Sequence, residues 1–257
     1  MAHESEYDDA LVTLLELIWG EGYMAPGGDG NVAKIAEGLD LRDKPVLEIG
    51  CGIGGPAFFL VRNYGANVVG TDLEPQLLEL ARQRAKKYGL EAKTDFQLVE
   101  PGPLGFPDES FDFVMSSGAF TQIEYKVEML KEVLRVLKPG GVFSCYEWMK
   151  SEGDYSEDMH YWFKLEGLTY ALETPERYEE LLSATGFVDV SVVERSDWYR
   201  KKAREEYELL RDELYPRAVE LIGEEHAAHR LENWRSMMVV CDKGELRQAY
   251  TRGHKPQ

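Results

Sequence analysis

The sequence Val46-Leu47-Glu48-Ile49-Gly50-Cys51-Gly52-Ile53-Gly54-Gly55 decides the fold of this chain. Its apolar first half, which Pro45 opens, predicts a strand that is buried in a parallel sheet. The glycines of the second half allow the backbone to approach a ligand closely. A helix that begins at Gly55 presents free N–H groups to an anion. The stretch therefore predicts a strand, a turn and a helix around an anionic ligand.

Strands and helices alternate along the chain after this stretch. The apolar patterns predict strands over residues 67–71, 95–99, 111–116, 142–147 and 188–194, and helices over 55–64, 75–88, 123–137 and 175–184. Gly89 and Pro139-Gly140-Gly141 stop two of these helices. Such alternation indicates an α/β protein with a Rossmann-like, mostly parallel sheet that helices cover on both faces.

The remaining segments depart from this alternation. Residues 150–174 are rich in aromatic side chains and contain no strand pattern. Further helices are predicted over 7–19, 32–38, 198–222 and 224–242, and a seventh strand over 246–253. We therefore expect a single domain over residues 1–257, with an N-terminal helical lid over 1–40 and helical cap insertions over 150–174 and 198–242.

The composition is that of a globular protein with a strong acidic excess. Hydrophobic residues make up 44% of the 257 residues and charged residues 30%, which leaves enough apolar material for a sizeable core. The 47 Asp and Glu residues outnumber the 29 Lys and Arg residues, for a net charge of -18. That charge opposes any partner whose binding depends on neutralising phosphates, so nucleic acid and anionic membranes are not expected partners.

Cysteine usage and the N-terminal sequence indicate the compartment. Cys51, Cys145 and Cys241 are odd in number and far apart, which fits neither a disulfide framework nor a zinc site. The N-terminus is acidic where a secretory signal would be basic and then apolar. No stretch reaches the roughly 18 apolar residues of a membrane span. From the cysteines and the N-terminus we expect a cytoplasmic protein. His226 and His229 lie on a charged helix, where solvated histidines are common, so we expect no metal.

Two cofactors fit the glycine turn. Gly50, Gly52 and Gly55 satisfy the G-x-G-x-x-G pattern of dinucleotide-binding enzymes, in which the anion is a pyrophosphate. In a methyltransferase the anion is instead the methionine carboxylate of S-adenosylmethionine. Asp72 closes the second strand, where a carboxylate accepts hydrogen bonds from ribose hydroxyls, and this serves both cofactors. The turn alone leaves both alternatives open.

Two later motifs separate the alternatives. Pro107-Asp108-Glu109-Ser110-Phe111-Asp112-Phe113-Val114 leads into the fourth strand, and Leu134-Arg135-Val136-Leu137-Lys138-Pro139-Gly140-Gly141-Val142 turns a helix into the fifth. In the order and spacing of these motifs, after the glycine turn and Asp72, the chain resembles class I S-adenosylmethionine-dependent methyltransferases. The resemblance implies a seven-stranded Rossmann-like methyltransferase fold with S-adenosyl-L-methionine as the cofactor.

The resemblance also implies cofactor roles for individual residues. It places Glu48 and the loop after it at the methionine end, Asp72 on the ribose and Leu73 against the adenine. Glu100 falls where the family usually has an acidic residue near the adenine amine, although the common residue is Asp and here Pro101 follows. The implied cofactor-binding residues are Glu48, Gly50, Cys51, Gly52, Gly54, Asp72, Leu73, Gln76, Glu100, Pro101 and Ser117.

A nicotinamide-dependent dehydrogenase is the runner-up within this fold. Tyr146 and Lys150 have the Tyr-x-x-x-Lys spacing of short-chain dehydrogenases. That pair needs a helix to face one way, and here it straddles a strand end. A binding module that keeps the fold without catalysis is a further alternative, since a glycine turn serves binding as well as catalysis.

A closer resemblance extends over nearly the whole chain. Ile18-Trp19-Gly20-Glu21-Gly22-Tyr23, followed by Gly27-Gly28, is similar to the N-terminal lid of phosphoethanolamine methyltransferases. Ser196-Asp197-Trp198-Tyr199 resembles the start of their long helix, while Trp234 and the ending Gly253-His254-Lys255-Pro256 resemble sarcosine and dimethylglycine methyltransferases. The resemblance implies that Tyr23 is the lid tyrosine, close to the transferred methyl group.

The chain departs from the phosphoethanolamine methyltransferases, here called the phosphobase enzymes, at the positions where those enzymes bind their substrate. Ser117-Gly118 and Gln122 stand in place of their Arg-Asp pair and histidine, and Leu15 replaces the tyrosine that partners this histidine. Leu168 and Met237 stand at two positions where those enzymes have basic residues that bind the phosphate. A doubly charged phosphate without a basic partner is strongly disfavoured in a closed pocket. Phosphoethanolamine is therefore not the expected acceptor.

The residues left near the expected pocket indicate the acceptor. Aromatic faces beside one carboxylate suit a cationic amine, by cation–π attraction of roughly 1 kcal/mol per contact. We expect methyl transfer to an amine nitrogen of a small osmolyte or amino-acid-like molecule, with Tyr23 and Gln122 as catalytic residues. The alternative is a neutral or apolar acceptor methylated at oxygen, sulfur or carbon, for which the same residues form an apolar wall. The expected substrate-binding residues are Tyr23, Gln122, Glu147, Trp148, Trp162 and Tyr170.

Two further features bear on catalysis and assembly. His160, in the aromatic segment, is a candidate proton acceptor. The helices over 198–242 either close the pocket or form the surface of a homodimer. The expected partners are a small-molecule substrate and, in the second case, another copy of the chain.

Overall fold

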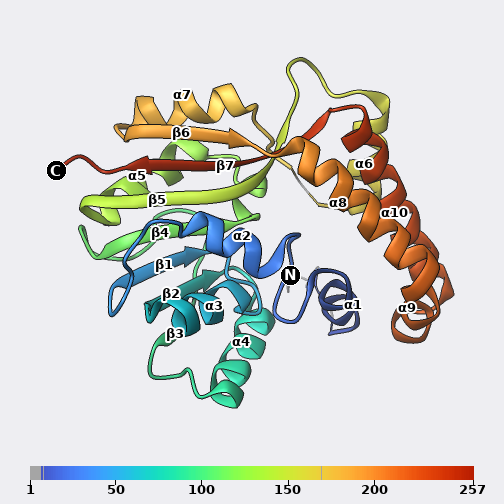
Figure 1. Cartoon of the computed structure of the whole chain (residues 1–257), viewed down its shortest axis with the longest axis horizontal. Helices are drawn as coiled ribbons and strands as arrows, with labels where there is room; N and C mark the ends of the chain where they lie inside the picture. The colour runs from blue at the N-terminus through green and yellow to red at the C-terminus, as the bar shows by residue number, and fades with distance from the viewer. Residues whose placement is uncertain (1–6, 8, 169) are drawn as a thin grey trace.

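Seven strands form one sheet in the computed structural model, which describes residues 7, 9–168 and 170–257 (Figure 1). Their order across the sheet is β3-β2-β1-β4-β5-β7-β6, and β7 runs antiparallel to β5 and β6. The strands are β1 (Pro45–Ile49), β2 (Asn67–Asp72), β3 (Thr94–Leu98), β4 (Phe111–Ser117), β5 (Leu137–Lys150), β6 (Val188–Glu194) and β7 (Leu246–His254). This confirms the predicted Rossmann-like, mostly parallel sheet.

Helices cover both faces of this sheet, because successive residues of a strand point to opposite sides. On β1, Val46 joins a hydrophobic core with three helices, and the next residue, Leu47, joins a core with two others. The helices on the first face are α2 (Gly28–Ile35), α3 (Gly55–Tyr64) and α4 (Pro75–Tyr88). Those on the second face are α5 (Lys126–Val136) and α7 (Pro175–Thr185).

A second group of helices lies beyond the carboxyl ends of the parallel strands (Figure 1). The group consists of α1 (Asp9–Trp19), α6 (Glu157–Glu166), α8 (Ser196–Leu209), α9 (Tyr215–Ile222) and α10 (Glu224–Asp242). These helices share a hydrophobic core of their own, in which Leu14, Trp162 and Tyr199 are fully buried. None of the helices in the described ranges combines the length and the apolar character that a bilayer span needs.

The helix predicted over 198–222 is two helices in the structure. A π-helical turn at Leu210–Leu214 separates α8 from α9, and Pro216 stands in the first turn of α9. A proline inside a helical pattern lacks the N–H that would continue the hydrogen-bond ladder, which explains the interruption.

The segments on either side of β4 and β5 also differ from the predicted bounds. The helix that was expected to start at residue 123 starts three residues later, because α5 begins at Lys126 after a 3-10 turn at Ala119–Gln122. The strand predicted over 142–147 is longer, because β4 pairs with it from Leu137 and β7 pairs with it as far as Lys150. The short helix predicted over 32–38 begins earlier, at Gly28.

Candidate active site

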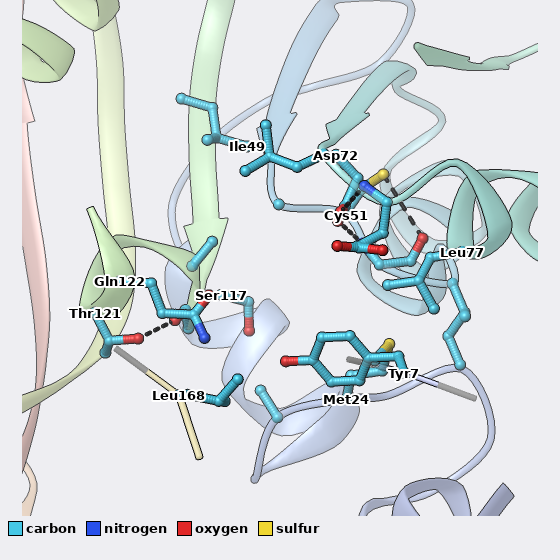
Figure 2. A pocket seen from close by; sticks show the side chains of 18 of the residues that line it. Tyr7, Met24, Ile49, Cys51, Asp72, Leu77, Ser117, Thr121, Gln122 and Leu168 are labelled. Carbon is cyan, nitrogen blue, oxygen red and sulfur yellow. Dashed lines mark hydrogen bonds between the residues drawn. The ribbon is translucent and has the colours of Figure 1, made fainter. Parts of the chain in front are cut away.

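A cavity of about 1020 Å³ opens at the carboxyl ends of the strands (Figure 2). In doubly wound sheets ligands bind at this edge, where the strand order reverses. β1 lies at that point, with β2 on one side and β4 on the other. We call residues 48–56, 71–77 and 99–102 that line the cavity its cofactor wall. The acceptor wall is the rest of the lining. It comes from residue 7, α1 and the loop after it, residue 104, the end of β4 and the turn after it as far as the start of α5, the end of β5, residues 166–168 and 170, and one face of α10.

The glycine turn of the cofactor wall is held against β2 by its backbone. The N–H groups of Gly50 and Cys51 both donate to the carbonyl oxygen of Thr71, at 2.8 and 2.9 Å. Gly50 has a φ of 72°, and a Cβ added to it would lie 2.2 Å from the Cβ of Ala119. Both the left-handed conformation and the close approach therefore require a glycine at this position.

The N-terminal segment packs on the same turn, backbone against backbone. The N–H of Gly55 donates to the carbonyl oxygen of Gly22 at 3.1 Å, and a Cβ added to Gly55 would lie 2.2 Å from that oxygen. The third glycine of the G-x-G-x-x-G pattern thus seats the segment after α1 on the start of α3. This contact brings Tyr23 and Met24 to the edge of the cavity.

Glu48 is a fully buried carboxyl group at the end of β1, and it lines the cavity. Neither of its oxygens has a hydrogen-bond partner within the described ranges, although the N–H of Ala57 is near enough to stabilise its charged form. Burial raises the pKa of Glu48 well above its usual range, and the charge of Asp72 raises it further. A buried carboxylate without a partner is costly, so this position fits a ligand group that is cationic and donates hydrogen bonds.

Asp72 ends β2 and turns its carboxylate toward the glycine turn (Figure 2). One oxygen accepts from the N–H of Gly52 at 2.8 Å, and the other accepts from the N–H of Glu74 at 3.1 Å. Burial raises the pKa of Asp72, and these backbone donors oppose the shift. A carboxylate that backbone donors fix in this way has lone pairs left for further donors in the cavity, such as the hydroxyls of a sugar.

The other residues of the predicted cofactor set surround these two carboxyl groups. Leu73 is 52% exposed, an apolar side chain left open to the cavity. The remaining members that line the cavity are Cys51, Gln76, Glu100, Pro101 and Ser117. Gly54 does not line it, because a Cβ added there would meet the rings of Phe58 and Phe96. Its φ of 89° shows that this glycine is needed to turn the backbone into α3.

Four of the six predicted acceptor residues line the cavity: Tyr23, Gln122, Trp148 and Tyr170. Gln122 ends the 3-10 turn after β4 and lies across the cavity from Asp72 (Figure 2). The hydroxyl of Tyr23 donates to the carboxylate of Asp29. Burial and this carboxylate raise the pKa of Tyr23 well above its usual range, so its phenol stays protonated.

The prediction that Glu147 and Trp162 contact the acceptor needs correction, because both lie behind the wall. Glu147 is fully buried and accepts from the backbone N–H of Thr121 at 3.0 Å. Burial raises the pKa of Glu147 to about 8. Trp162 is also fully buried and stacks on Tyr170, with ring centroids 5.1 Å apart and planes at 18°. These residues support the wall and are absent from the lining.

One face of α10 contributes to the cavity, and two residues on this face, Arg230 and Asn233, were not singled out from the sequence. Arg230, Asn233, Trp234 and Met237 all line it. Their spacing of three, four and seven residues places them on one side of a helix, and this pattern was readable from the sequence. The guanidinium of Arg230 has no hydrogen bond or ion pair within the described ranges, and Arg230 is the one basic residue among the described residues of the lining.

Other candidates from the sequence lie away from the cavity. His160 is exposed, packs against Tyr155 and is absent from the lining. The ring nitrogens of His226 and His229 lie 3.1 and 2.8 Å from backbone carbonyl oxygens. The side chains Leu15, Leu168 and Met237, which stand at the substrate positions of the phosphobase enzymes, do line the cavity.

The fold and the site define a Rossmann-like domain with a glycine turn, a strand-end aspartate and a buried glutamate at one cavity. Residues 47–145, which contain all three of these features, match the methyltransferase-domain family. Residues 47–145 therefore form a methyltransferase domain with a Rossmann-like fold and S-adenosylmethionine as its cofactor. The sequence prediction of the fold, of this family and of its cofactor is confirmed.

Curated relatives match most of this chain, and solved structures share its fold. Phosphoethanolamine N-methyltransferase 1 of Zea mays is 28% identical over 246 residues, which are 94% of this chain and 48% of that protein. Phosphoethanolamine N-methyltransferase 2 of Haemonchus contortus, solved with phosphomonomethylethanolamine and S-adenosylhomocysteine, superposes with a TM-score of 0.91 at 24% identity over 99% of this chain and 59% of that one.

A third protein is similar over its full length. A putative sarcosine dimethylglycine methyltransferase from Galdieria sulphuraria has a TM-score of 0.83 at 22% identity, over 97% of this chain and 99% of that one. By contrast, the chain spans about half the length of the plant relatives that it matches.

Proposed function

We propose that this chain transfers a methyl group from S-adenosylmethionine to the nitrogen of a small amine that also carries an acidic group. The bound cofactor supplies an electrophilic methyl group on its sulfonium. The protein supplies binding, alignment of the acceptor and exclusion of water. Each of these tasks falls to a different part of the cavity.

We assign the cofactor to the wall beside β1 and β2. Glu48 would receive the cationic amino group of the methionine moiety, which its two unpartnered oxygens support. The carboxylate of that moiety would lie against the backbone of the glycine turn, whose N–H groups at Gly50, Cys51 and Gly52 already donate within the protein. Asp72 would accept from the ribose hydroxyls. Leu73, exposed in the cavity, would cover the adenine, with Glu100 near the adenine amine.

Aromatic side chains of the acceptor wall support an amine as the acceptor. Trp148 and Tyr170 lie with ring centroids 6.0 Å apart, and Trp19 and Trp234 lie with theirs 5.7 Å apart. All four line the cavity. Ring faces attract a cation by roughly 1 kcal/mol each, more where water is excluded. Gln122 and Tyr23 would align the nitrogen beside the transferred methyl group.

The observation that carries the proposal is the unpaired guanidinium of Arg230 in this wall. Its neighbour on the same helix face, Trp234, offers a ring to the same ligand, while the amide of Asn233 donates to the carboxylate of Glu166. A guanidinium in a partly closed cavity binds a carboxylate or phosphate through two parallel hydrogen bonds. An amine that also bears such a group is therefore matched at both ends.

Arg230 also changes the argument against a phosphate. The sequence offered no basic residue in place of Leu168 and Met237, whereas the structure brings one from a different turn of α10. A single guanidinium neutralises the one charge of a carboxylate but only part of the two charges of a phosphate. The cavity therefore fits an amino-acid-like amine better than a phosphorylated one.

The test compares acceptors that differ in their acidic group. Release of S-adenosylhomocysteine is measured with sarcosine, with phosphoethanolamine and with ethanolamine, which has no acidic group. Arg230→Gln should raise KM for sarcosine about tenfold to a hundredfold, the effect of losing a charge-assisted pair, and leave KM for ethanolamine unchanged. Arg217→Gln, at an exposed site on α9, is the control and should change neither KM.

Other results would point to the other functions. Turnover of neutral alcohols or thiols but not of amines would indicate that the acceptor wall serves as an apolar surface, and it would refute amine methylation. Calorimetric heat with a nicotinamide dinucleotide but none with S-adenosylhomocysteine would favour a dehydrogenase. Equal KM changes for sarcosine and ethanolamine in Arg230→Gln would remove the acidic group from the proposal.

We further propose that residues 1–40 act as a lid and that residues 150–174 and 198–242 act as helical caps on a single domain. The support is that α1, α6 and α10 all contribute residues to the cavity. Cys51, Cys145 and Cys241 are free and buried, which fits a reducing compartment such as the cytoplasm.

A further inference from the structure

Glu206 is a buried carboxyl group that the proposed function does not use. It lies on α8 and is 1% exposed. Neither of its oxygens has a hydrogen-bond partner within the described ranges. Charged groups are almost never buried without a partner, because the loss of hydration is expensive. A buried carboxylate without a donor at ordinary hydrogen-bond distance therefore needs an explanation.

The groups nearest to Glu206 belong to the acceptor wall. The indole N–H groups of Trp19 and Trp234 act on its charged form, and neither N–H has another partner within the described ranges. The charge of Glu206 also raises the pKa of Tyr146. All three aromatic residues line the cavity, so the carboxylate stands directly behind a wall of rings.

The nearest cation does not neutralise this carboxylate. Lys202, one turn earlier on α8, favours the charged form of Glu206 through space. Its ammonium group lies 3.3 Å from the carboxylate of Glu205, which is exposed. Glu206 itself has no salt bridge within the described part of the chain. Its negative charge is thus available to the cavity.

We propose that Glu206 is the counter-charge of the acceptor: acting through the indoles of Trp19 and Trp234, it makes this wall selective for a cationic nitrogen. The inference rests on the proposed function, because an amine nitrogen that gains a methyl group also gains a positive charge. A carboxylate behind the rings strengthens their attraction for that charge. Glu206 does not touch the acceptor, so it is a positioning residue.

Among its described residues, the acceptor wall itself contains one carboxylate, Glu166, which accepts from the amide of Asn233. Arg230 and Glu206 add two opposite charges to the acceptor wall. Arg230 lies on α10, one turn of helix before Trp234, and Glu206 lies behind Trp234 on α8. An acceptor with a cationic nitrogen and an anionic tail would have one counter-charge for each end. This arrangement also fixes the orientation in which the acceptor binds.

The pH dependence gives a signature that a packing role would not. Burial raises the pKa of Glu206 to about 7, so its carboxylate gains charge as the pH rises through that value. The titratable or polar groups that face it are Trp19 from α1, Tyr146 from β5, Tyr199, Lys202 and Glu205 from α8, and Trp234 and Cys241 from α10. The affinity for a ligand of fixed positive charge should therefore increase from pH 6 to pH 8.

The test uses choline, whose charge does not vary with pH, and its uncharged isostere 3,3-dimethylbutan-1-ol. Calorimetry on the full chain with S-adenosylhomocysteine should show tighter binding of choline by the wild type. Glu206→Gln should weaken choline binding about tenfold, abolish its pH dependence and leave the isostere unchanged. Glu205→Gln, the neighbouring exposed carboxylate, should have none of these effects.

Two further measurements separate a charge effect from a folding effect. Glu206→Asp keeps the charge and should keep the preference for choline even where the Tm falls. A wild type without that preference, or equal losses for choline and the isostere in Glu206→Gln, would overturn the role of Glu206. Turnover of amines by the wild type tests the proposed function separately, since it does not depend on this preference.

Discussion

The cofactor wall and the acceptor wall of the cavity differ in what they are made of. The cofactor wall is a set of backbone turns at strand ends, where Gly50, Cys51 and Gly52 make contacts through main-chain atoms. The acceptor wall is a set of side chains from α1, α6, α10 and β5. A backbone site tolerates few sequences and is therefore recognisable, whereas a side-chain site can be rebuilt one residue at a time.

The two walls also differ in how their buried charged side chains are partnered. In the cofactor wall, Asp72 is fixed by two backbone donors, and Glu48 stands ready for a cationic group. In the acceptor wall, Arg230 faces the cavity directly, whereas the carboxylate of Glu206 is screened by rings. We infer that cofactor recognition uses direct contact and that acceptor recognition combines direct contact with a charge at a distance.

The largest expected effect is the loss of cofactor binding when the glycine turn is filled. In Gly50→Ala the new Cβ would lie 2.2 Å from the Cβ of Ala119, and the backbone would keep an unfavourable φ of 72°. The turn must therefore move away from the 3-10 turn after β4. Calorimetry should show the affinity for S-adenosylhomocysteine falling about a hundredfold, or about 3 kcal/mol.

The control for this change is a glycine with the same backbone conformation and free space. Gly89 has a φ of 68°, and a Cβ added to it would meet nothing within 4 Å. Gly89→Ala should therefore cost about 1 kcal/mol of stability and leave the affinity for S-adenosylhomocysteine unchanged. Equal affinity losses in both variants would show that the strain of a positive φ, and not the close approach to Ala119, lowers the affinity.

A smaller effect is expected at Lys126, which joins the turn after β4 to the segment that begins at residue 170, behind the acceptor wall. Lys126 is buried and donates to the carbonyl oxygens of Ile123 and Ala171, and the N–H of Ala171 donates to the carbonyl oxygen of Thr121 at 2.8 Å. Lys126→Met should lower the free energy of unfolding by about 2 kcal/mol, because it leaves two carbonyl groups and Glu147 without this donor and charge. Urea unfolding measures the change.

Lys131→Met is the matched control, since Lys131 is exposed on the same helix. Its free energy of unfolding should stay within about 0.5 kcal/mol of the wild type. If Lys126→Met were equally neutral, the contact between the turn after β4 and residues 170–174 would not depend on this lysine.

Taken per pH unit, the smallest effect is a slope of stability with pH from Glu147. Its pKa of about 8 in the folded chain lies above the ordinary value of 4.5, so the folded state binds more protons between these pH values. The free energy of unfolding should therefore fall as the pH rises from about 4.5 to about 8, by at most about 1.4 kcal/mol per pH unit from this group. Glu147→Gln should flatten the slope measured by urea unfolding, and Glu124→Gln, at an exposed site nearby, should not.

Elements with a clear apolar pattern and marked ends in the sequence were predicted well. The bounds of α3, α4, β6 and α10 agree with the sequence analysis to the residue, and glycine or proline marks at least one end of each of the first two. The start of α5 was wrong, because the apolar pattern begins at Ile123 whereas the chain makes a 3-10 turn first. The break between α8 and α9 was missed although Pro216 indicates it.

The sequence by itself determined the cofactor wall, because its glycines, Glu48 and Asp72 lie within 25 residues of each other and act through backbone geometry that a short motif specifies. Only the tertiary structure decided the acceptor wall. It moved Glu147 and Trp162 behind the cavity, brought Arg230 into it and placed Glu206 behind Trp19 and Trp234. The physical reason is that these side chains come from helices and strands far apart in the chain, and their positions depend on how the helices pack.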